Sequence, residues 1–475
     1  MAGRSRRDIL KAGCATVLAA GAFGGNFAVA DDTAVLTVDQ SAKGIPVAPS
    51  FTGLSFETAL LTQGSVLAAA NHSLVSLIRS LGPQGVIRLG GNSSDRPLAR
   101  PSRAAIGQLA GFMHATGWSL IYGLDLGSGS PAAAADEARD VIELAGPSLI
   151  AFQIGNEPDL YDRGLRSPAW TVRDFIEEWG RFADGILASV PEARFAGPDI
   201  ASQPGWLMPF ASGCGRRVAL LTRHYYSGGP PSSPLVNAAS LLGSDADLAE
   251  IIGEARGAAA VAGLPVRMTE TNSIYWGGKP GVSDTLAAAV WGADFMFQLA
   301  EAGWQGINFH GGSAGMVYSP IVLGQDRGAV ARPLYQGMLF FAAAMASRIL
   351  PVRLSPRPGL RGYAVRGLDG GTRVAITNKS LTATARVTIA ADADRPALLR
   401  LTGADPAATA VSIGIGDQVA ARGNRDWRRP LEAAETKEGA FTVAVAPCSA
   451  VLIDLDGRSS PLRNRGGRAS AVAGR

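Results

Sequence analysis

Glu157 and Glu270 are the two residues of this chain whose type and setting point most directly to chemistry. Each follows an apolar, strand-like run, at residues 148–153 for Glu157 and at 264–268 for Glu270. This pattern predicts a carboxylate at the carboxyl end of each strand, where barrel enzymes hold their reacting groups. Two carboxylates that face each other there could cleave a glycosidic bond, because one can protonate the leaving oxygen while the other supports the cationic sugar.

The setting of Glu157 also allows a second interpretation. An Asn-Glu-Pro sequence such as residues 156–158 is typical of a loop that leads into the start of a helix. That interpretation requires no second carboxylate at the end of another strand. The presence of Glu270 therefore favours a catalytic pair.

Strand-like runs and helical patterns alternate along the first 350 residues. The runs are β-rich or apolar, are bounded by Gly, Pro or Asn, and end near Glu57, Gly90, Leu126, Gly155, Ile200, Tyr226, Thr269 and His310. Helical patterns occupy residues 64–81, 102–117, 132–146, 168–190, 204–213, 236–262, 284–301 and 333–348. These eight units predict an α/β fold with a closed (β/α)₈ TIM barrel over residues 51–350. An open doubly wound sheet is the alternative, but the glycines at 123–129 lack the spacing of its phosphate-binding fingerprint.

The pattern changes after residue 351 to short alternating runs with turn residues between them. The runs occupy residues 360–365, 373–377, 385–389, 397–401 and 441–445. They predict an antiparallel β-sandwich over residues 351–456. Residues 35–38, within an N-terminal segment at 31–50, predict one more strand that joins this sandwich. Residues 403–438 allow no placement of strands, and we expect the basic tail at 457–475 to be disordered.

Length and charge fit a globular protein of two domains. The 475 residues exceed what one hydrophobic core usually supports, and 47% hydrophobic with 18% charged residues is an ordinary composition. The net charge of +4 comes from the two ends, because residues 1–30 carry +3 and residues 457–475 carry +5. The segment between them therefore carries about −4. Such a balance gives no reason to expect nucleic acid as a partner.

The first thirty residues have the pattern of an export signal. Ser-Arg-Arg-Asp-Ile-Leu-Lys at residues 5–11 resembles the twin-arginine motif, an apolar stretch follows at 12–29, and Ala-Val-Ala at 28–30 suits a signal peptidase. We therefore expect the twin-arginine export machinery as a partner, a mature chain that begins near Asp31, and a periplasmic or secreted location. A membrane anchor is the alternative interpretation of the apolar stretch, which the Ala- and Gly-rich composition disfavours.

Cysteine and histidine usage indicates neither a disulfide nor a metal site. Cys214 and Cys448 fall in different predicted domains, and twin-arginine substrates fold in the reducing cytoplasm. We therefore predict two buried thiols. The four histidines show no clustered spacing with cysteine, so the sequence predicts no metal.

Four motifs together resemble those of a known family. They are Arg-Leu-Gly-Gly-Asn at 88–92, Gly-Asn-Glu-Pro at 155–158, His-Tyr-Tyr at 224–226, and the segment at 270–284. In this order they look like glycoside hydrolase family 79, the family of β-glucuronidases and heparanase within a clan of retaining (β/α)₈ enzymes. The resemblance covers about residues 51–345, and the segment at 270–284 is its specific part. It implies Glu157 as general acid/base, Glu270 as nucleophile, and no cofactor.

The same resemblance implies which neighbours assist the two glutamates. Asn156 would hydrogen-bond the 2-hydroxyl of the sugar, a contact that strengthens in the transition state. A tyrosine of the His-Tyr-Tyr motif would hold the nucleophile. Strand alternation sends Tyr225 and Tyr226 to opposite faces, so we expect only one of them to do so, and we favour Tyr225.

Other positions would bind the rest of the sugar. Glu57 resembles the acidic residue that binds distal hydroxyls, with Asn92 beside it. The groups that would receive a uronate carboxylate are Tyr275, Tyr318 and the backbone amides around Gly277 and Gly278. Lys279 is a further candidate partner for that carboxylate, although a lysine in a glycine-rich loop is usually solvated.

The sequence therefore predicts an exported, retaining, exo-acting β-glycosidase, with a β-glucuronide as its carbohydrate substrate. An endo-acting heparanase-like glycosidase or another exo-β-glycosidase of the clan is the alternative. The slightly negative balance of residues 31–456 argues against a long basic groove for sulfated polyanions. A carbohydrate-binding barrel without activity is the alternative outside enzymes, but such a protein needs neither Glu157 nor Glu270.

Overall fold

The computed structural model describes residues 33–64, 66–96, 99–324, 328–391, 396–414, 435–437 and 439–456. The predicted signal at 1–30 and tail at 457–475 lie outside these residues, as does most of the irregular segment at 403–438.

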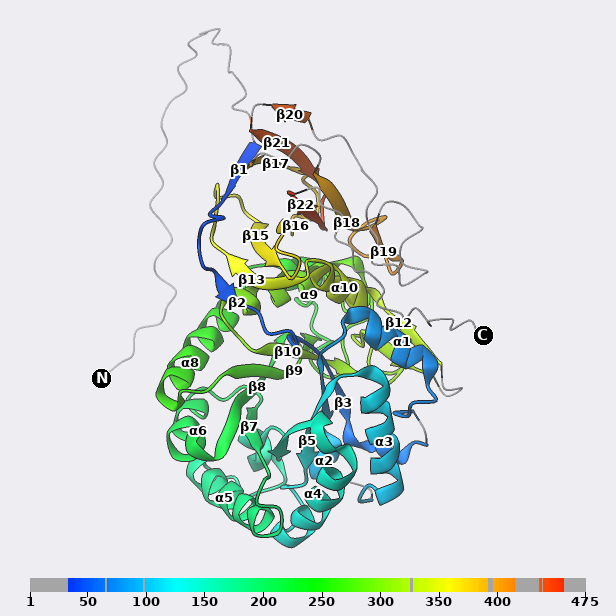
Figure 1. Ribbon diagram of the computed structural model, residues 1–475, viewed down its shortest axis with the longest axis vertical. Coiled ribbons are helices and arrows are strands. Elements are labelled where there is room, and N and C mark those ends of the chain that lie inside the picture. The colour runs from blue at the N-terminus through cyan, green and yellow to red at the C-terminus, as the bar shows by residue number, and fades with distance from the viewer. Residues whose placement is uncertain are drawn as a thin grey trace, which may run out of the picture. The chain divides into compact units, whose positions relative to one another are not determined.

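Eight parallel strands form a closed barrel (Figure 1). They are β3 (Thr52–Glu57), β4 (Val86–Gly90), β5 (Ser119–Leu124), β6 (Leu149–Ile154), β7 (Phe195–Ile200), β8 (Val218–Gly228), β9 (Val266–Ile274) and β10 (Gly306–Gly311). The strands follow one another around the barrel in chain order, and β10 closes it by pairing with both β9 and β3. The predicted barrel is therefore confirmed.

Helices surround the strands on the outside of the barrel (Figure 1). They are α1 (His72–Leu81), α2 (Asn92–Asp95), α3 (Arg103–Thr116), α4 (Pro131–Ala145), α5 (Val172–Ser189), α6 (Leu207–Cys214), α7 (Ala238–Leu242), α8 (Ala246–Ala262), α9 (Leu286–Glu301) and α10 (Pro333–Ala343). Side chains fix several of their starts, because the oxygens of Ser102, Ser130, Thr171 and Asp245 accept a backbone N–H of the first turn. None of the described helices is long and apolar enough to cross a membrane.

Four predicted boundaries were wrong. The helix expected at 64–81 begins only at His72, where the side chain of Asn71 caps its start. The helix expected at 333–348 ends at Ala343, because residues 346–350 instead form β13, which pairs with two other strands. The helix expected at 236–262 is α7 and α8, since Asp245 caps a new helix start. The seventh barrel strand does not end near residue 269 but runs to Ile274, with every residue buried. The second half of this strand is polar, so an apolar run does not predict where the strand ends.

Two further sheets, built mainly of antiparallel strands, follow the barrel. The first has the order β14-β1-β17-β21-β20, with β14 (Val352–Leu354), β1 (Thr33–Val38), β17 (Ala385–Ala390), β21 (Ala440–Val445) and β20 (Glu435–Lys437). The second has the order β19-β18-β22-β16-β15-β13-β2, with β19 (Val411–Gly414), β18 (Ala397–Gly403), β22 (Ser449–Asp454), β16 (Thr372–Asn378), β15 (Leu360–Gly367), β13 (Ala346–Leu350) and β2 (Ile45–Pro46). The N-terminal strand β1 pairs with β14 and β17, as predicted.

The strand β22 was missed because all six of its residues are buried and therefore show no alternation. One apolar cluster has members from both sheets, among them Leu36, Val387, Val374 and Ile453. This cluster gives the region after the barrel a hydrophobic core of its own.

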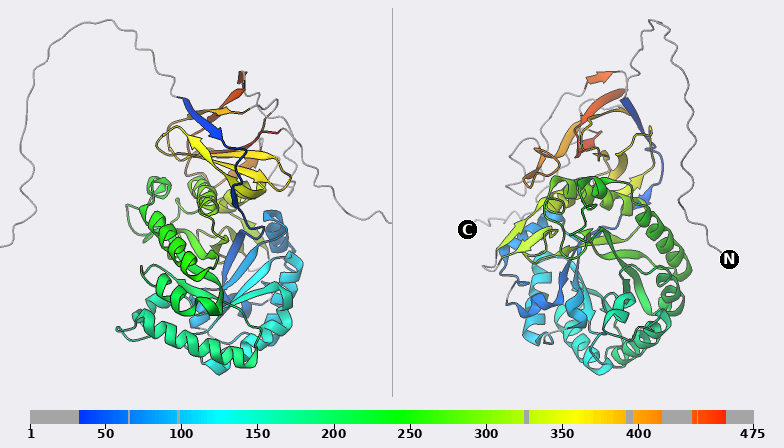
Figure 2. Two further views of the ribbon diagram at one scale, coloured as in Figure 1. Left: turned by 60° about the vertical axis from the view of Figure 1, so that its left-hand side comes forward. Right: turned by 180° about the vertical axis from the view of Figure 1, so that it is seen from behind.

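Asp294 of α9 connects the barrel to these sheets. Its side chain is buried and accepts hydrogen bonds from Tyr363 Oη at 2.7 Å and from Thr377 Oγ1 at 2.9 Å. The ammonium of Lys379 lies 3.1 Å from its second oxygen. The two views in Figure 2 show the sheets beside the last barrel helices. Cys214 and Cys448 are both buried and unpaired, as predicted.

Candidate active site

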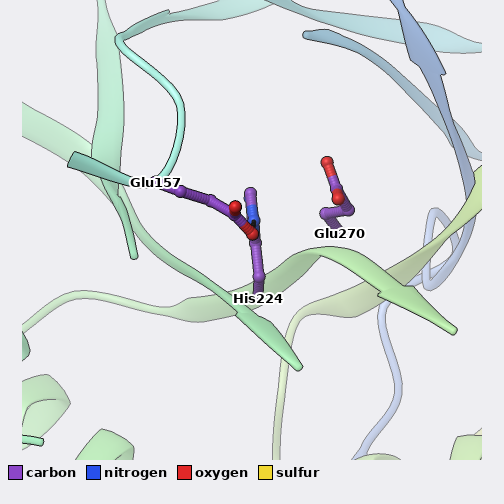
Figure 3. Close-up of side chains that lie close together, drawn as sticks. All are labelled: Glu157, His224 and Glu270. Carbon is purple, nitrogen blue, oxygen red and sulfur yellow. Dashed lines mark hydrogen bonds and ion pairs between the residues drawn. The ribbon is translucent and has the colours of Figure 1, made fainter. Parts of the chain in front are cut away.

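Glu157 and Glu270 both lie at the carboxyl ends of the barrel strands. Glu157 stands three residues after β6, with φ at +51°, and its N–H donates to the carbonyl of Asp199 at 3.0 Å. Glu270 does not close its strand as predicted but lies inside β9. The pairing of β9 with both neighbours shifts register near Glu270, which marks a local bulge there. Figure 3 shows Glu157 reaching from its loop toward His224, with Glu270 across from it.

The two carboxylates are close together. One oxygen of Glu157, one of Glu270 and a ring nitrogen of His224 all lie within 4.8 Å of one another. Both glutamates are mostly enclosed, with side-chain exposures of 17% for Glu157 and 8% for Glu270. Strands β6 and β9, the fourth and seventh of the barrel, therefore bring the predicted pair into one site.

Arg88 on β4 is the fully buried centre of this site. Its Nη1 donates to Glu270 Oε2 at 2.6 Å. Its Nη2 donates to Asp199 Oδ2 at 2.5 Å and to Asn156 Oδ1 at 2.7 Å. The guanidinium therefore compensates two buried carboxylates and also fixes the amide beside Glu157.

Glu270 is held in the ionised state. Burial alone would raise its pKa, but the nearby charges of His310, His224 and Arg88 outweigh burial and lower the pKa well below its usual range. A hydrogen bond from Tyr226 Oη to Glu270 Oε1, at 2.8 Å, acts in the same direction.

The prediction that Tyr225 holds Glu270 was therefore wrong, because Tyr226 makes that bond. Tyr225 points to the other side of β8, where its hydroxyl donates to the Asp245 carboxylate and its ring packs 5.5 Å from that of Phe295. The two tyrosines do lie on opposite faces, as strand alternation requires.

The pKa of Glu157 is shifted in the opposite direction, upward. Its burial raises the pKa above the usual value, and the negative charge of Glu270 adds to this rise. A hydrogen bond with His224 Nδ1, at 3.0 Å from Glu157 Oε1, partly offsets it. The two glutamates of one site are thus driven toward different protonation states.

His224 carries a positive charge. Burial would lower its pKa, but Asp199, with Oδ2 at 2.7 Å from Nε2, and Glu270 raise it to about 10. Both ring nitrogens then act as donors, one to Glu157 and one to Asp199. Glu157, His224 and Glu270 have the spacing of a metal site, but both ring nitrogens of His224 already contact carboxylates, Glu157 Oε1 at 3.0 Å and Asp199 Oδ2 at 2.7 Å.

Glu57, at the end of β3, is held from two sides. Its Oε2 accepts hydrogen bonds from the backbone and hydroxyl of Ser93, and its Oε1 lies 3.4 Å from His310 Nε2. Burial would raise the pKa of Glu57, but these contacts with His310 and Ser93 lower it. Asn92, at the start of α2, accepts a hydrogen bond from Asn156 Nδ2 at 3.3 Å. Both predicted sugar-binding groups therefore lie at the same end of the barrel as the glutamate pair.

The loops after β9 and β10 bring two of the predicted carboxylate-binding groups together, Tyr318 and the backbone at Gly277. Tyr318 is 3% exposed, its ring lies 6.0 Å from that of Tyr226, and its N–H donates to the carbonyl of Gly277 at 3.3 Å. Tyr275 directly follows β9 and is half-buried. Lys279 is not solvated and does not point to a substrate carboxylate, since its Nζ donates to two backbone carbonyls at 2.8 Å.

Five acidic or basic groups of the site were not assigned a role from the sequence, two of them being Arg88 and His224. Asp199, the last residue but one of β7, binds both of these, while His310 on β10 lies between Glu57 and Glu270. Asp95 accepts Asn156 N–H at 2.7 Å and the hydroxyl of Tyr161 at 2.6 Å. A charged residue inside or just after an apolar strand run was the available signal for Asp199 and His310.

Comparisons with known proteins agree with the resemblance drawn from the motifs. The chain matches no protein-family model. It is 27% identical over 296 residues to a β-glucuronidase of Aspergillus niger and 25% identical over 341 residues to a β-glucuronidase of Neurospora crassa. These alignments cover 51% and 58% of this chain but 54% and 60% of the relatives, so the chain spans little more than half the length of the proteins that it matches.

The fold is also similar to that of a solved structure, a 4-O-α-L-rhamnosyl-β-D-glucuronidase from Fusarium oxysporum. The TM-score is 0.73 at 18% identity, and the superposition covers 89% of this chain and 100% of the other. The barrel and its carboxylate pair resemble those of glycoside hydrolases. The two β-glucuronidases and the solved rhamnosyl-glucuronidase that the chain matches support the resemblance to family 79 glycosidases.

Proposed function

We propose that this protein is a retaining, exo-acting β-glucuronidase, with Glu270 as nucleophile and Glu157 as general acid/base. In the first step Glu270 would attack the anomeric carbon while Glu157 gives its proton to the leaving oxygen. In the second step Glu157, now a carboxylate, would take a proton from the water that releases the sugar.

The balance of charges in the site is the observation that carries this proposal. Arg88 and two histidines with raised pKa values, His224 and His310, face the site's carboxyl groups, and their contacts lower the pKa of three of these groups, Glu57, Asp199 and Glu270. The fourth carboxyl, Glu157, has a raised pKa. A protonated acid beside an ionised carboxylate is what the first step requires.

The distance between the glutamates supports retention of configuration. Carboxyl groups lie about 5 to 5.5 Å apart in retaining enzymes, against about 6.5 to 9.5 Å in inverting ones. Oxygens of Glu157 and Glu270 within 4.8 Å of each other fit the retaining geometry and leave no room for a water between the sugar and its base.

The glucuronide is proposed as the substrate from the groups that would face its C6 carboxylate. Tyr318 lies beside Tyr226, the partner of Glu270, and its N–H bonds the carbonyl of Gly277, while Tyr275 directly follows β9; the two relatives that the chain matches are β-glucuronidases. Glu57 and Asn92 would bind hydroxyls at the far side of the sugar, and Asn156 would bind the 2-hydroxyl. An endo-acting, heparanase-like glycosidase and another exo-β-glycosidase of the clan are the alternatives.

Two further expectations belong to the same proposal. We propose that the protein is exported by the twin-arginine route to the periplasm or the medium, because of the pattern at residues 5–30. We also propose that the two sheets after the barrel form a β-sandwich, which the apolar cluster shared by both sheets supports.

A panel of 4-nitrophenyl β-glycosides that differ only at C6 or in ring configuration tests the substrate. We expect kcat/KM for the glucuronide to exceed that for the glucoside by roughly 10⁴, because hydroxymethyl leaves the buried donors unpaired. A glucoside or galactoside that is hydrolysed as fast as the glucuronide would refute a uronate as the substrate. NMR of the first sugar released tests the mechanism, since an α-anomer as first product would refute retention.

A further inference from the structure

Two large apolar side chains stand in solvent at the active-site end of the barrel. Trp276 and Leu235 are each 79% exposed. Trp276 lies in the loop that directly follows β9, the strand of Glu270, and Leu235 lies in the loop after β8. Neither side chain packs in the hydrophobic core. Exposed apolar side chains of this size often mark a binding surface.

The two loops are fastened to each other at two places. Lys279 Nζ donates to the carbonyls of Ser233 and Val236, both at 2.8 Å, and these residues flank Leu235. Gly229 lies flat against the ring of Tyr275, where a β-carbon would come within 2.4 Å of ring atoms. Leu235 and Trp276 are therefore presented by one connected surface rather than by two independent loops.

The backbone of Trp276 supports a role in recognition. Its φ is +58°, a conformation that bulky residues rarely adopt and that stores strain. Its indole contacts the ring of Tyr275 edge-on, with centroids 5.0 Å apart and an angle of 77° between the planes. This contact leaves the indole largely in solvent, where it is free to contact a flat ring.

The barrel order shows which part of a substrate this surface would meet. Strand β8 is four strands from β4, and therefore opposite it, and β9 is opposite β5. Asn92, after β4, would bind far hydroxyls of the sugar on that opposite side, next to Ser93, which donates a hydrogen bond to Glu57 of β3. The connected loops lie instead on the side of His224, the partner of the acid Glu157 that faces the leaving group.

We propose that Trp276 and Leu235 form the binding surface for the leaving group of the substrate, and that they select glycosides whose leaving group carries a flat ring. The ring would be an aromatic aglycone or the apolar face of a sugar. This inference rests on the proposed glycosidase function but not on the identity of the sugar. The carboxylate-binding groups would determine which sugar the enzyme accepts. The surface of Trp276 and Leu235 would determine which leaving group that sugar may carry.

Benzyl and methyl β-glucuronide form the test pair, because both release a primary alcohol of similar basicity and differ in the ring alone. Trp276→Ala should lower kcat/KM for the benzyl glycoside by about tenfold, the size of a lost ring contact, and leave the methyl glycoside within about twofold. Leu235→Ala should act in the same direction with a smaller effect. Leu368→Ala is the matched control, since Leu368 is also exposed, at 65%, but lies in the turn between β15 and β16.

Three outcomes would overturn the inference. They are equal losses on both glycosides, no loss on either, and a loss confined to glucuronides that carry a substituent on the 4-hydroxyl. A wild type that cleaves benzyl and methyl glycosides of another sugar would refute the proposed uronate, and the same pair of that sugar would then test Trp276. Inactivity toward every β-glycoside would overturn both.

Discussion

Neighbouring tyrosines on β8 offer an internal comparison of a site contact with a structural one. Tyr226→Phe removes one hydroxyl that donates to Glu270, and Tyr225→Phe removes one that donates to Asp245. Tyr225 is buried and Tyr226 is half-buried, and both changes delete a single oxygen from the same strand. Any difference in catalysis therefore reflects the partner and not the strand.

The expected size follows from the charge of each partner. Hydrogen bonds to ionised groups are worth about 1.5 to 3 kcal/mol, so loss of the Tyr226 bond should lower kcat/KM by roughly 10- to 150-fold if it orients the nucleophile. Arg88 remains bound to Glu270 in this variant, so activity should not vanish. Tyr225→Phe should cost about 0.5 to 1.5 kcal/mol of stability and leave the rate within about twofold.

The pH profile separates orientation from a general loss of structure. Glu270 must be ionised, so the acid limb of kcat/KM falls as pH drops through its pKa. The Tyr226 bond lowers that pKa, and its removal should therefore move the acid limb to higher pH. Tyr225→Phe should leave the limb in place. Initial rates on 4-nitrophenyl β-glucuronide from pH 3 to 9, with thermal unfolding of each variant, measure both effects. Equal rate losses in the two variants, or an acid limb that Tyr225→Phe moves to higher pH and Tyr226→Phe does not, would refute the assignment of Tyr226.

Three further predictions concern other groups of the site. Glu270→Gln should abolish turnover of every glycoside, whereas Glu157→Gln should still react with activated aryl glycosides and regain turnover with azide; the same residual rate in both would show the roles to be misassigned. His224→Gln removes a cation that lowers the pKa of Glu157, so the alkaline limb of the rate should move to higher pH; a limb that moves down contradicts this. Asp95 accepts four donors, so Asp95→Asn turns an N–H toward one of them and should cost roughly 1 to 3 kcal/mol, seen as a lower unfolding temperature; an unchanged temperature argues against it.

The barrel and its glutamate pair could be predicted because their signals are local. An apolar run that ends in a polar group defines a buried parallel strand and its carboxyl end without any knowledge of the partners. Seven of the eight predicted strand ends lie within two residues of the observed ones, as at Glu57 and Gly90. The apolar run before Glu270 did not predict the end of its strand, because β9 continues through residues that are polar but buried.

The contacts within the site could not be predicted because they depend on register between strands. Alternation shows that Tyr225 and Tyr226 face opposite sides, but it does not show which side faces the nucleophile. That choice follows from an irregular register between β8 and β9 at Arg223 and His224, which only the folded barrel reveals. Asp95 and Asp199 cannot be recognised from local sequence, because their partners are between 25 residues (Asp199 to His224) and 111 residues (Asp199 to Arg88) away in the chain.

The charges of the site also limit how it would recognise a uronate. Arg88, His224 and His310 are already engaged with Glu57, Asp199 and Glu270. Lys279, the basic residue of the loop that follows β9, is bound to backbone carbonyls. A substrate carboxylate would therefore meet neutral donors, the tyrosine hydroxyls and backbone amides around Gly277. Such donors distinguish a carboxylate from a hydroxymethyl group by geometry and desolvation, and they do so without disturbing the cations that keep Glu270 ionised while Glu157 holds its proton.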